Sequence, residues 1–327
     1  MEIGAIKEYL GKDWQDVTNT IVSVLQSDIQ LLNHTNNSIL SHSGKQLRPL
    51  MSILFARLCG NGQANEAAVR YAAAAELLHN ATLLHDDVAD DSDQRRGVPT
   101  IRSIMGPSVS VLLGDYWLVK AMELILQDKE SDTAIIKIFS KTLSDLAQGE
   151  MLQLQKAQTG DTDISDYLRI VYSKTASLFE ASCVSAVESS TDSDVYIKGA
   201  RDYAVALGIA FQIKDDILDY DGTDSVGKPL GVDVLEQKIT LPLLGAMVNA
   251  GKQEEDRIRR MVKDITEHPE YQVEIVSFVK SNGGLGYAEE MLGSYVKSAI
   301  EALAVFPDSY EKSCLEDLAY YTSKRIK

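Results

Sequence analysis

Residues 67–90 read AAVRYAAAAELLHNATLLHDDVAD, and this stretch gives the strongest indication of the fold class. It contains neither glycine nor proline, and residues 72–84 are nearly all apolar. Alanine and leucine have high helix propensities, so the stretch predicts one long helix. Because apolar residues occupy most of its surface, we expect other helices to cover it.

The rest of the chain repeats apolar residues at spacings of three and four. In residues 14–32, Val17, Ile21 and Val24 fall on one helical face. The same pattern predicts helices over residues 109–127, 132–156, 164–189, 195–220, 238–250, 255–265 and 286–304. Breaks such as Gly97-Val98-Pro99 separate the helices, but no segment has the composition of a linker. Residues 1–327 are therefore expected to form a single all-α domain, a helical bundle.

The balance of charge and the cysteine content exclude several classes of protein. The 327 residues include 48 acidic and 32 basic side chains, a formal net charge of −16. Nucleic acids and anionic lipids attract clustered basic residues, so both are disfavoured as partners. The three cysteines (59, 183 and 314) form no CxxC pair, which favours a reducing compartment. With no secretory pattern and no apolar run of membrane-spanning length, we expect a cytoplasmic protein without stable membrane insertion.

An acidic motif, DDVAD, ends the long apolar helix. Asp86 and Asp90 lie one helical turn apart, Asp87 lies at the edge of the same face, and His79 lies two turns earlier. Alone, such a cluster is typical of a solvated helix end. Here the helix is expected to be buried, and like-charged carboxylates at its end repel one another unless a cation neutralises them.

A second motif of the same spacing occurs in FQIKDDILD, residues 211–219. Gln212, Asp215 and Asp219 share a helical face, and Asp216 is adjacent. Carboxylates without a nearby histidine and cysteine set favour Mg²⁺ over zinc, and Mg²⁺ commonly takes its remaining ligands from phosphates and water. A calcium loop starting near this motif is excluded, because Ile217 and Lys228 stand where oxygen ligands are needed.

Compact basic motifs stand out in this acidic chain. Each would ordinarily be a solvated surface cation, but together with two acidic motifs they indicate binding of anions such as diphosphates. The residues concerned are Lys45, Arg48, Arg95, Arg96, Lys174 (followed by Thr175), Lys228 and Lys238.

These motifs, in this order, resemble those of the trans-prenyltransferases, the all-trans isoprenyl diphosphate synthases. The matching segments are GKQLRP, HNATLLHDD, RRGVPT, KTA, FQIKDDILDY and KITLP, between about Lys45 and Pro242. The resemblance implies the isoprenoid synthase helical bundle with a central catalytic cavity, and a homodimer. It also implies condensation of an allylic diphosphate with isopentenyl diphosphate through an allylic carbocation.

The resemblance assigns roles to residues of this chain. Three Mg²⁺ would be held by Asp86, Asp87, Asp90, Asp215, Asp216 and Asp219. Binding of the allylic diphosphate would be assisted by Arg95, Lys174, Lys228 and Lys238. Isopentenyl diphosphate would be bound by Lys45, Arg48, His79 and Arg96. The Thr175 hydroxyl and the Gln212 carbonyl would stabilise the carbocation.

Small residues before the first motif favour a long-chain polyprenyl product, such as a quinone side-chain precursor. Ala81 and Thr82 stand where short-chain members of the family carry bulky aromatic residues, although Phe139 is an alternative floor for the cavity. The alternatives are a short-chain C15 or C20 synthase and a non-catalytic regulatory subunit, which would be expected to lose one acidic motif. A terpene cyclase would not need Lys45, Arg48 and His79 for a second diphosphate.

Overall fold

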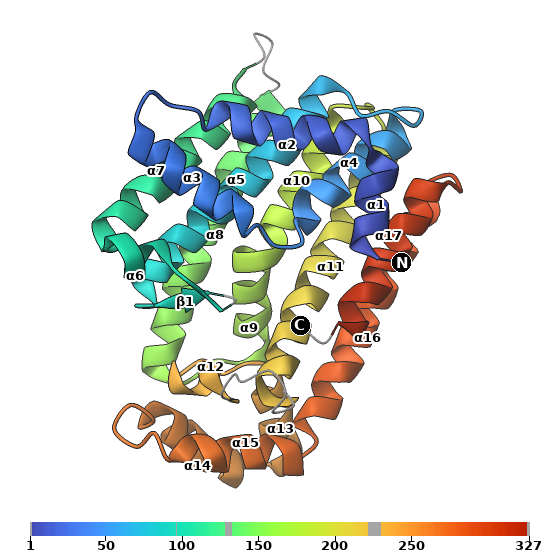
Figure 1. The fold of residues 1–327 in the computed structure, drawn as a ribbon. Helices are drawn as coiled ribbons and strands as arrows, with labels where there is room; N and C mark the ends of the chain where they lie inside the picture. The colour runs from blue at the N-terminus through green and yellow to red at the C-terminus, as the bar shows by residue number, and fades with distance from the viewer. Residues whose placement is uncertain (1, 96, 128–132, 222–229, 326–327) are drawn as a thin grey trace. The chain divides into compact units, whose positions relative to one another are not determined.

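The computed structural model describes residues 2–95, 97–127, 133–221 and 230–325 (Figure 1). These residues are almost entirely helical, with one two-stranded hairpin, so the predicted all-α fold class is confirmed. Within the described residues, no helix combines the length and apolar character needed to cross a membrane. The chain divides into two compact units. Unit 1 comprises residues 1–140, 181–200 and 306–315, and unit 2 comprises residues 141–180, 201–305 and 316–327.

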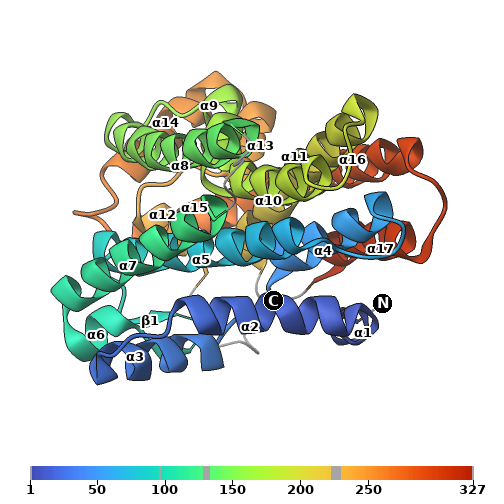
Figure 2. The ribbon, with the colours of Figure 1, turned by 90° about the horizontal axis from the view of Figure 1, so that it is seen from above.

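Unit 1 contains the long apolar helix and the helices that cover it. They are α1 (Ile3–Leu10), α2 (Lys12–Val24), α3 (Gln30–Ser41), α4 (Leu47–Cys59), α5 (Glu66–Ala89), α6 (Ile101–Met105) and α7 (Pro107–Ile125), with the hairpin β1 (Gln94–Arg95) and β2 (Val98–Pro99). The α5 helix lies against α4 and α7, and α1–α3 lie across one side of this layer (Figure 2). Because Ala72–Ala75 are fully buried, their small side chains allow close packing around α5.

Unit 2 contains the second acidic motif. Its helices are α9 (Ile164–Val171), α12 (Val232–Leu235), α13 (Leu241–Ala250), α14 (Lys252–Lys263), α15 (Tyr271–Ser281) and α16 (Gly284–Ala302). Both units include parts of α8 (Thr133–Thr159), α10 (Ser177–Glu188), α11 (Asp194–Asp221) and α17 (Tyr310–Lys324). The helices predicted over residues 109–127, 132–156 and 195–220 correspond to α7, α8 and α11.

The helix predicted over residues 14–32 is interrupted. Helix α2 ends at Val24 and α3 begins at Gln30, and asparagine side chains from α3 bind the backbone between them. Asn33 both accepts from the backbone N–H of Ser27 at 3.0 Å and donates to its carbonyl at 2.6 Å, while Asn36 donates to the Leu25 carbonyl at 3.0 Å. These bonds replace helical hydrogen bonds, which periodicity alone does not reveal.

The helix predicted over residues 164–189 contains a π-helical turn, Tyr172–Ala176, between α9 and α10. Two glycines allow neighbouring helices to approach this turn closely. A Cβ atom on Gly149 of α8 would lie 2.6 Å from Cβ of Ser173, and one on Gly208 of α11 would lie 2.6 Å from Cα of Ala176. Such turns are frequent at functional sites, and this one carries Lys174 and Thr175.

Candidate active site

The first acidic motif lies where α5 ends. Ala89 is the last residue of the helix, and the backbone N–H of Asp90 still donates to the carbonyl of Asp86 at 2.8 Å. Asp86 is half-buried and Asp90 is exposed, but Asp87, predicted at the edge of the face, is only 5% exposed. Arg95 Nε donates to Asp87 Oδ1 at 2.8 Å, so this buried carboxylate is neutralised from within the chain.

The loop after this motif is held in place by its own polar residues. Arg95 belongs to β1 of the hairpin, which the sequence did not predict. Thr100 Oγ1 donates to the carbonyl of Ser92 at 2.8 Å, and Arg102 binds the carboxylates of both Asp91 and Asp93. These contacts hold the loop between Asp87 and Arg95, the two residues that pair.

Three of the four residues predicted to bind isopentenyl diphosphate lie in the described part of unit 1. Lys45 and Arg48 are half-buried at the start of α4, and His79 is half-buried on α5. Between the two cations, Gln46 has a φ of 57°, and its side chain accepts a hydrogen bond from Lys7 Nζ at 2.9 Å. The N-terminal helix thereby supports the strained loop that carries Lys45. Arg96 and Lys228 lie outside the described residues.

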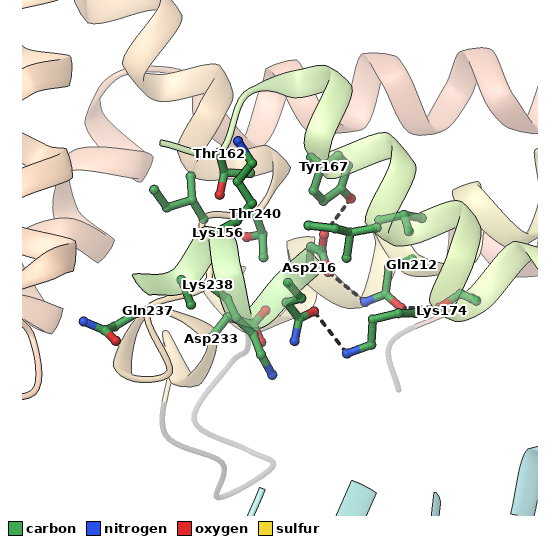
Figure 3. Close-up of a pocket in the computed structure, with 16 residues that line it drawn as sticks. Lys156, Thr162, Tyr167, Lys174, Gln212, Asp216, Asp233, Gln237, Lys238 and Thr240 are labelled. Carbon is green, nitrogen blue, oxygen red and sulfur yellow. Dashed lines mark hydrogen bonds between the residues drawn. The ribbon is translucent and has the colours of Figure 1, made fainter. Parts of the chain in front are cut away.

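The second motif borders a cavity of about 150 Å³ in unit 2. Five of the predicted residues line it, namely Lys174, Thr175, Gln212, Asp216 and Lys238 (Figure 3). They come from the π-helical turn, from α11 and from the segment before α13, so the fold gathers three distant motifs. The first and last acids of the motif, Asp215 and Asp219, are not among the residues that line the cavity.

Each acid of the second motif is bound by other groups of unit 2. Asp216 is 2% exposed and accepts two hydrogen bonds, which are considered in detail below. The carboxylate of Asp215 pairs with Arg325 at 2.8 Å. Asp219 accepts from the backbone N–H groups of Val232 and Asp233 at 3.1 and 3.3 Å, and so caps the start of α12.

The lysines at the cavity also have acidic or amide partners. Lys174 Nζ lies 2.5 Å from Glu150 Oε2 and donates to Gln153 Oε1 at 3.1 Å. Lys238 pairs with Glu236. Because these cations are held beside the cavity without being deeply buried, they can exchange part of these contacts for an anionic ligand.

A further carboxylate, Asp233, lines the same cavity and was not predicted. Burial and the charge of Asp233 raise the pKa of Asp216, while burial and the charge of Asp219 raise the pKa of Asp233. Crowded carboxylates of this kind suit a cation, since a cation would stabilise their ionised forms. In the part of the chain that the structure describes, no three acidic, histidine or cysteine side chains are gathered so that they alone could hold a metal ion. Mg²⁺ fits this donor set, because it binds through a few carboxylates together with phosphates and water.

Sequence reasoning missed Tyr167, Asp233 and Arg325. Arg325 follows the last turn of α17, its side chain is 4% exposed, and its guanidinium stacks on the ring of Phe211 at 3.8 Å. No motif marks these residues, because their roles arise only when distant segments pack. Asp233 alone had a sequence signal, as an acid between the second motif and Lys238.

An all-α fold with two DDxxD motifs and a cavity lined by lysine, threonine and glutamine has the features of the isoprenoid synthase helical fold. The chain belongs to the polyprenyl synthetase family, whose family model matches residues 29–279. It is 34% identical to the octaprenyl diphosphate synthase of Haemophilus influenzae, over 99% of this chain and 98% of that protein.

Two solved structures of the family are similar over the whole chain. The decaprenyl diphosphate synthase from Rhodobacter capsulatus is 32% identical, with a TM-score of 0.91 and all of both chains covered. The polyprenyl synthase from Caulobacter crescentus, solved with calcium and isoprenyl diphosphate, is 33% identical, with a TM-score of 0.90 over 100% of this chain and 98% of that one. The predicted family and enzyme class are therefore confirmed.

Proposed function

We propose that this protein condenses an allylic diphosphate with isopentenyl diphosphate and repeats the step to make a long all-trans polyprenyl diphosphate. The observation that carries the proposal is the cavity of unit 2, where Lys174, Thr175 and Gln212 lie beside the second acidic motif. The full-length similarity to octaprenyl and decaprenyl diphosphate synthases supports a long product.

Metal binding is proposed for the acids of both motifs. Asp86, Asp90, Asp215 and Asp219 are the partly or fully exposed members, whereas Asp87 and Asp216 are buried. The calcium and isoprenyl diphosphate in the Caulobacter crescentus structure support a divalent cation at the substrate. We propose Mg²⁺, three ions per site, which when bound would stabilise the charge of the departing pyrophosphate.

The chain's own residues bind and orient the two substrates. Lys174 and Lys238, with Arg95 and Lys228, are proposed to bind the allylic diphosphate. Its C–O bond breaks, and the electron pair leaves with pyrophosphate. The double bond of isopentenyl diphosphate then attacks the allylic cation, and a proton is lost to pyrophosphate. Lys45, Arg48, His79 and Arg96 are proposed to hold isopentenyl diphosphate in attack geometry, which supplies the entropic part of the rate.

Release of pyrophosphate tests this function against its rivals. With Mg²⁺, release is expected only when both an allylic diphosphate and isopentenyl diphosphate are present. A terpene cyclase would release pyrophosphate from the allylic substrate alone. A regulatory subunit would release none with either or both substrates, and either result would contradict the proposal.

We propose a homodimer that uses an apolar stripe on α7. Leu112, Val119 and Leu126 recur every seven residues, so they share one helical face, and they are 68%, 51% and 49% exposed. Leu112→Glu is expected to convert the dimer to monomer in light scattering, because a charge would be buried at the contact. Val273→Glu on α15, at a residue 74% exposed, is the control and should leave the dimer intact. A Leu112→Glu protein that stays dimeric would contradict the stripe as the contact.

Residues 1–327 are proposed to unfold as one cooperative domain, which a single calorimetric transition would support and two separate transitions would contradict.

We also propose a cytoplasmic location. The three cysteines form no CxxC pair, which favours a reducing compartment. Recovery of the protein in the membrane pellet after cell fractionation would contradict that location.

A further inference from the structure

A chain of three hydrogen bonds connects α9 with the cavity of unit 2. Tyr167 Oη donates to Asp216 Oδ2 at 2.6 Å, and Gln212 Nε2 donates to Asp216 Oδ1 at 2.9 Å. Thr175 Oγ1 then donates to Gln212 Oε1 at 2.9 Å. Figure 3 shows Tyr167, Asp216 and Gln212 in sequence along one side of the cavity.

The direction of each bond follows from the groups that Asp216 binds. Both of its oxygens accept, one from the Tyr167 hydroxyl and one from the Gln212 amide nitrogen, so the Gln212 amide turns its oxygen toward Thr175. The Thr175 hydroxyl uses its single proton to donate a hydrogen bond to that oxygen. Lone pairs of the Thr175 hydroxyl therefore remain for a ligand in the cavity that both residues line.

Burial makes this arrangement stable. Tyr167 is 4% exposed and Asp216 is 2% exposed, so neither can exchange its partner for bulk water. A buried carboxylate that loses a hydrogen-bond donor is left with an unsatisfied oxygen, and here the other side chain that donates to the same carboxylate is the Gln212 amide. The orientation of that amide consequently depends on the hydroxyl of Tyr167.

We propose that Tyr167 is a positioning residue that, through Asp216, orients the Gln212 amide and the Thr175 hydroxyl toward the allylic carbocation. This inference rests on the proposed function. Electron-rich oxygens fixed before the reaction stabilise charge that appears only as the C–O bond breaks. Tyr167 therefore acts on the ionisation step and not on the binding of either diphosphate.

Asp87 of the first motif provides a parallel. It is the middle acid of its motif, it is buried, and it binds a side chain of the protein, Arg95. In both motifs the middle acid thus holds a neighbouring functional group, whereas the first and last acids are partly or fully exposed.

Tyr167→Phe tests the inference, with Tyr172→Phe as the matched control. Tyr172 lies on the π-helical turn, and its hydroxyl also donates to a carboxylate, Glu180 at 2.8 Å, but it does not line the cavity. Tyr167→Phe is expected to lower kcat about ten- to hundredfold, the usual cost of losing an outer-shell partner, with KM for both substrates unchanged. Tyr172→Phe should keep the kcat of the unmodified protein.

Binding without reaction provides the second measurement. A thiolodiphosphate analogue of the allylic substrate does not ionise readily, so calorimetry with Mg²⁺ reports binding alone. Tyr167→Phe should leave both the Kd of the analogue and the Mg²⁺ concentration needed for half-maximal activity unchanged. A rise in either as large as the fall in kcat would overturn the inference, because Tyr167 would then act on the binding of the metal or the substrate and not on ionisation. An unchanged kcat would overturn it as well.

Asp216→Asn is the second variant, because it keeps the shape of the side chain but can present an amide nitrogen to Gln212. We expect a similar loss of kcat, and no further loss when it is combined with Tyr167→Phe, since both act on one network. Additive losses would contradict the network. If the unmodified protein releases no pyrophosphate with both substrates, the proposed function itself fails; if it does and Tyr167→Phe matches it, only this inference fails.

Discussion

Asp86→Asn and Asp215→Asn are each expected to lower turnover by about a thousandfold or more, while the far-ultraviolet circular dichroism spectrum stays unchanged. Each change removes a charge proposed to hold the metal–diphosphate complex, and electrostatic stabilisation of a leaving group is usually the largest single contribution to catalysis. Both side chains are partly exposed, so the fold should tolerate the change. Asparagine is preferred to alanine at position 215, because Arg325 is buried and keeps an oxygen partner.

Asp256→Asn is the control for these two variants. Asp256 is an exposed acid on α14 that pairs with Lys252, and its loss should leave turnover unchanged. The double variant Asp86→Asn/Asp215→Asn is expected to be little worse than either single variant, because residues that act on one diphosphate do not contribute additively. Turnover within tenfold of the unmodified protein in either single variant would refute the roles proposed for the motifs.

Ala81→Phe is expected to shorten the product from a long chain to the C15–C20 range. Ala81 lies five residues before Asp86 on α5, where an aromatic ring would occupy space needed by the growing chain. The effect should appear as a change in the size of the extracted products on thin-layer chromatography. The rate of the first condensation should change much less, because the ring lies more than one turn of α5 before Asp86.

The burial of Ala81 sets the controls for this experiment. Ala81 is fully buried, so a phenylalanine there can also destabilise the helix by overpacking, and Tm must be measured alongside product length. Thr82→Phe, at a half-buried residue, introduces the same ring with less strain. Phe139→Ala tests the alternative floor, and a longer product would assign that role to Phe139. Unchanged product length in both ring-inserting variants would reject Ala81 and Thr82 as determinants of chain length.

Helices that bury an apolar face are predicted well from the sequence. The 67–90 prediction agrees with α5 to within a residue at each end, because its alanines and leucines favour a helix and pack against α4 and α7. The predicted boundaries of a helix are wrong where individual residues at its end set the start. The predicted 238–250 helix begins only at Leu241, after Thr240, with Pro242 in its first turn. A proline in the first turn marks such a start, which the apolar spacing alone does not show.

Other features have no local signal in the sequence. Each strand of the hairpin has two residues, too few for alternation to show. The π-helical turn depends on the close approach of Gly149 and Gly208 from distant helices. The sequence assigns the same role to all the acids of the two motifs. Their surroundings differ in the structure, because Asp87 and Asp216 are buried against protein partners that only the tertiary structure supplies.

Product sizing tests the proposed function most directly. The unmodified protein is incubated with labelled isopentenyl diphosphate, Mg²⁺ and, in separate reactions, each of the C5, C10, C15 and C20 allylic diphosphates, and the extracted products are separated by length. We expect labelled all-trans polyprenyl products longer than C20 from at least one starter, and none without Mg²⁺. Products that stop at C15 or C20 with every starter, or no labelled product at all, would contradict a long-chain polyprenyl diphosphate synthase.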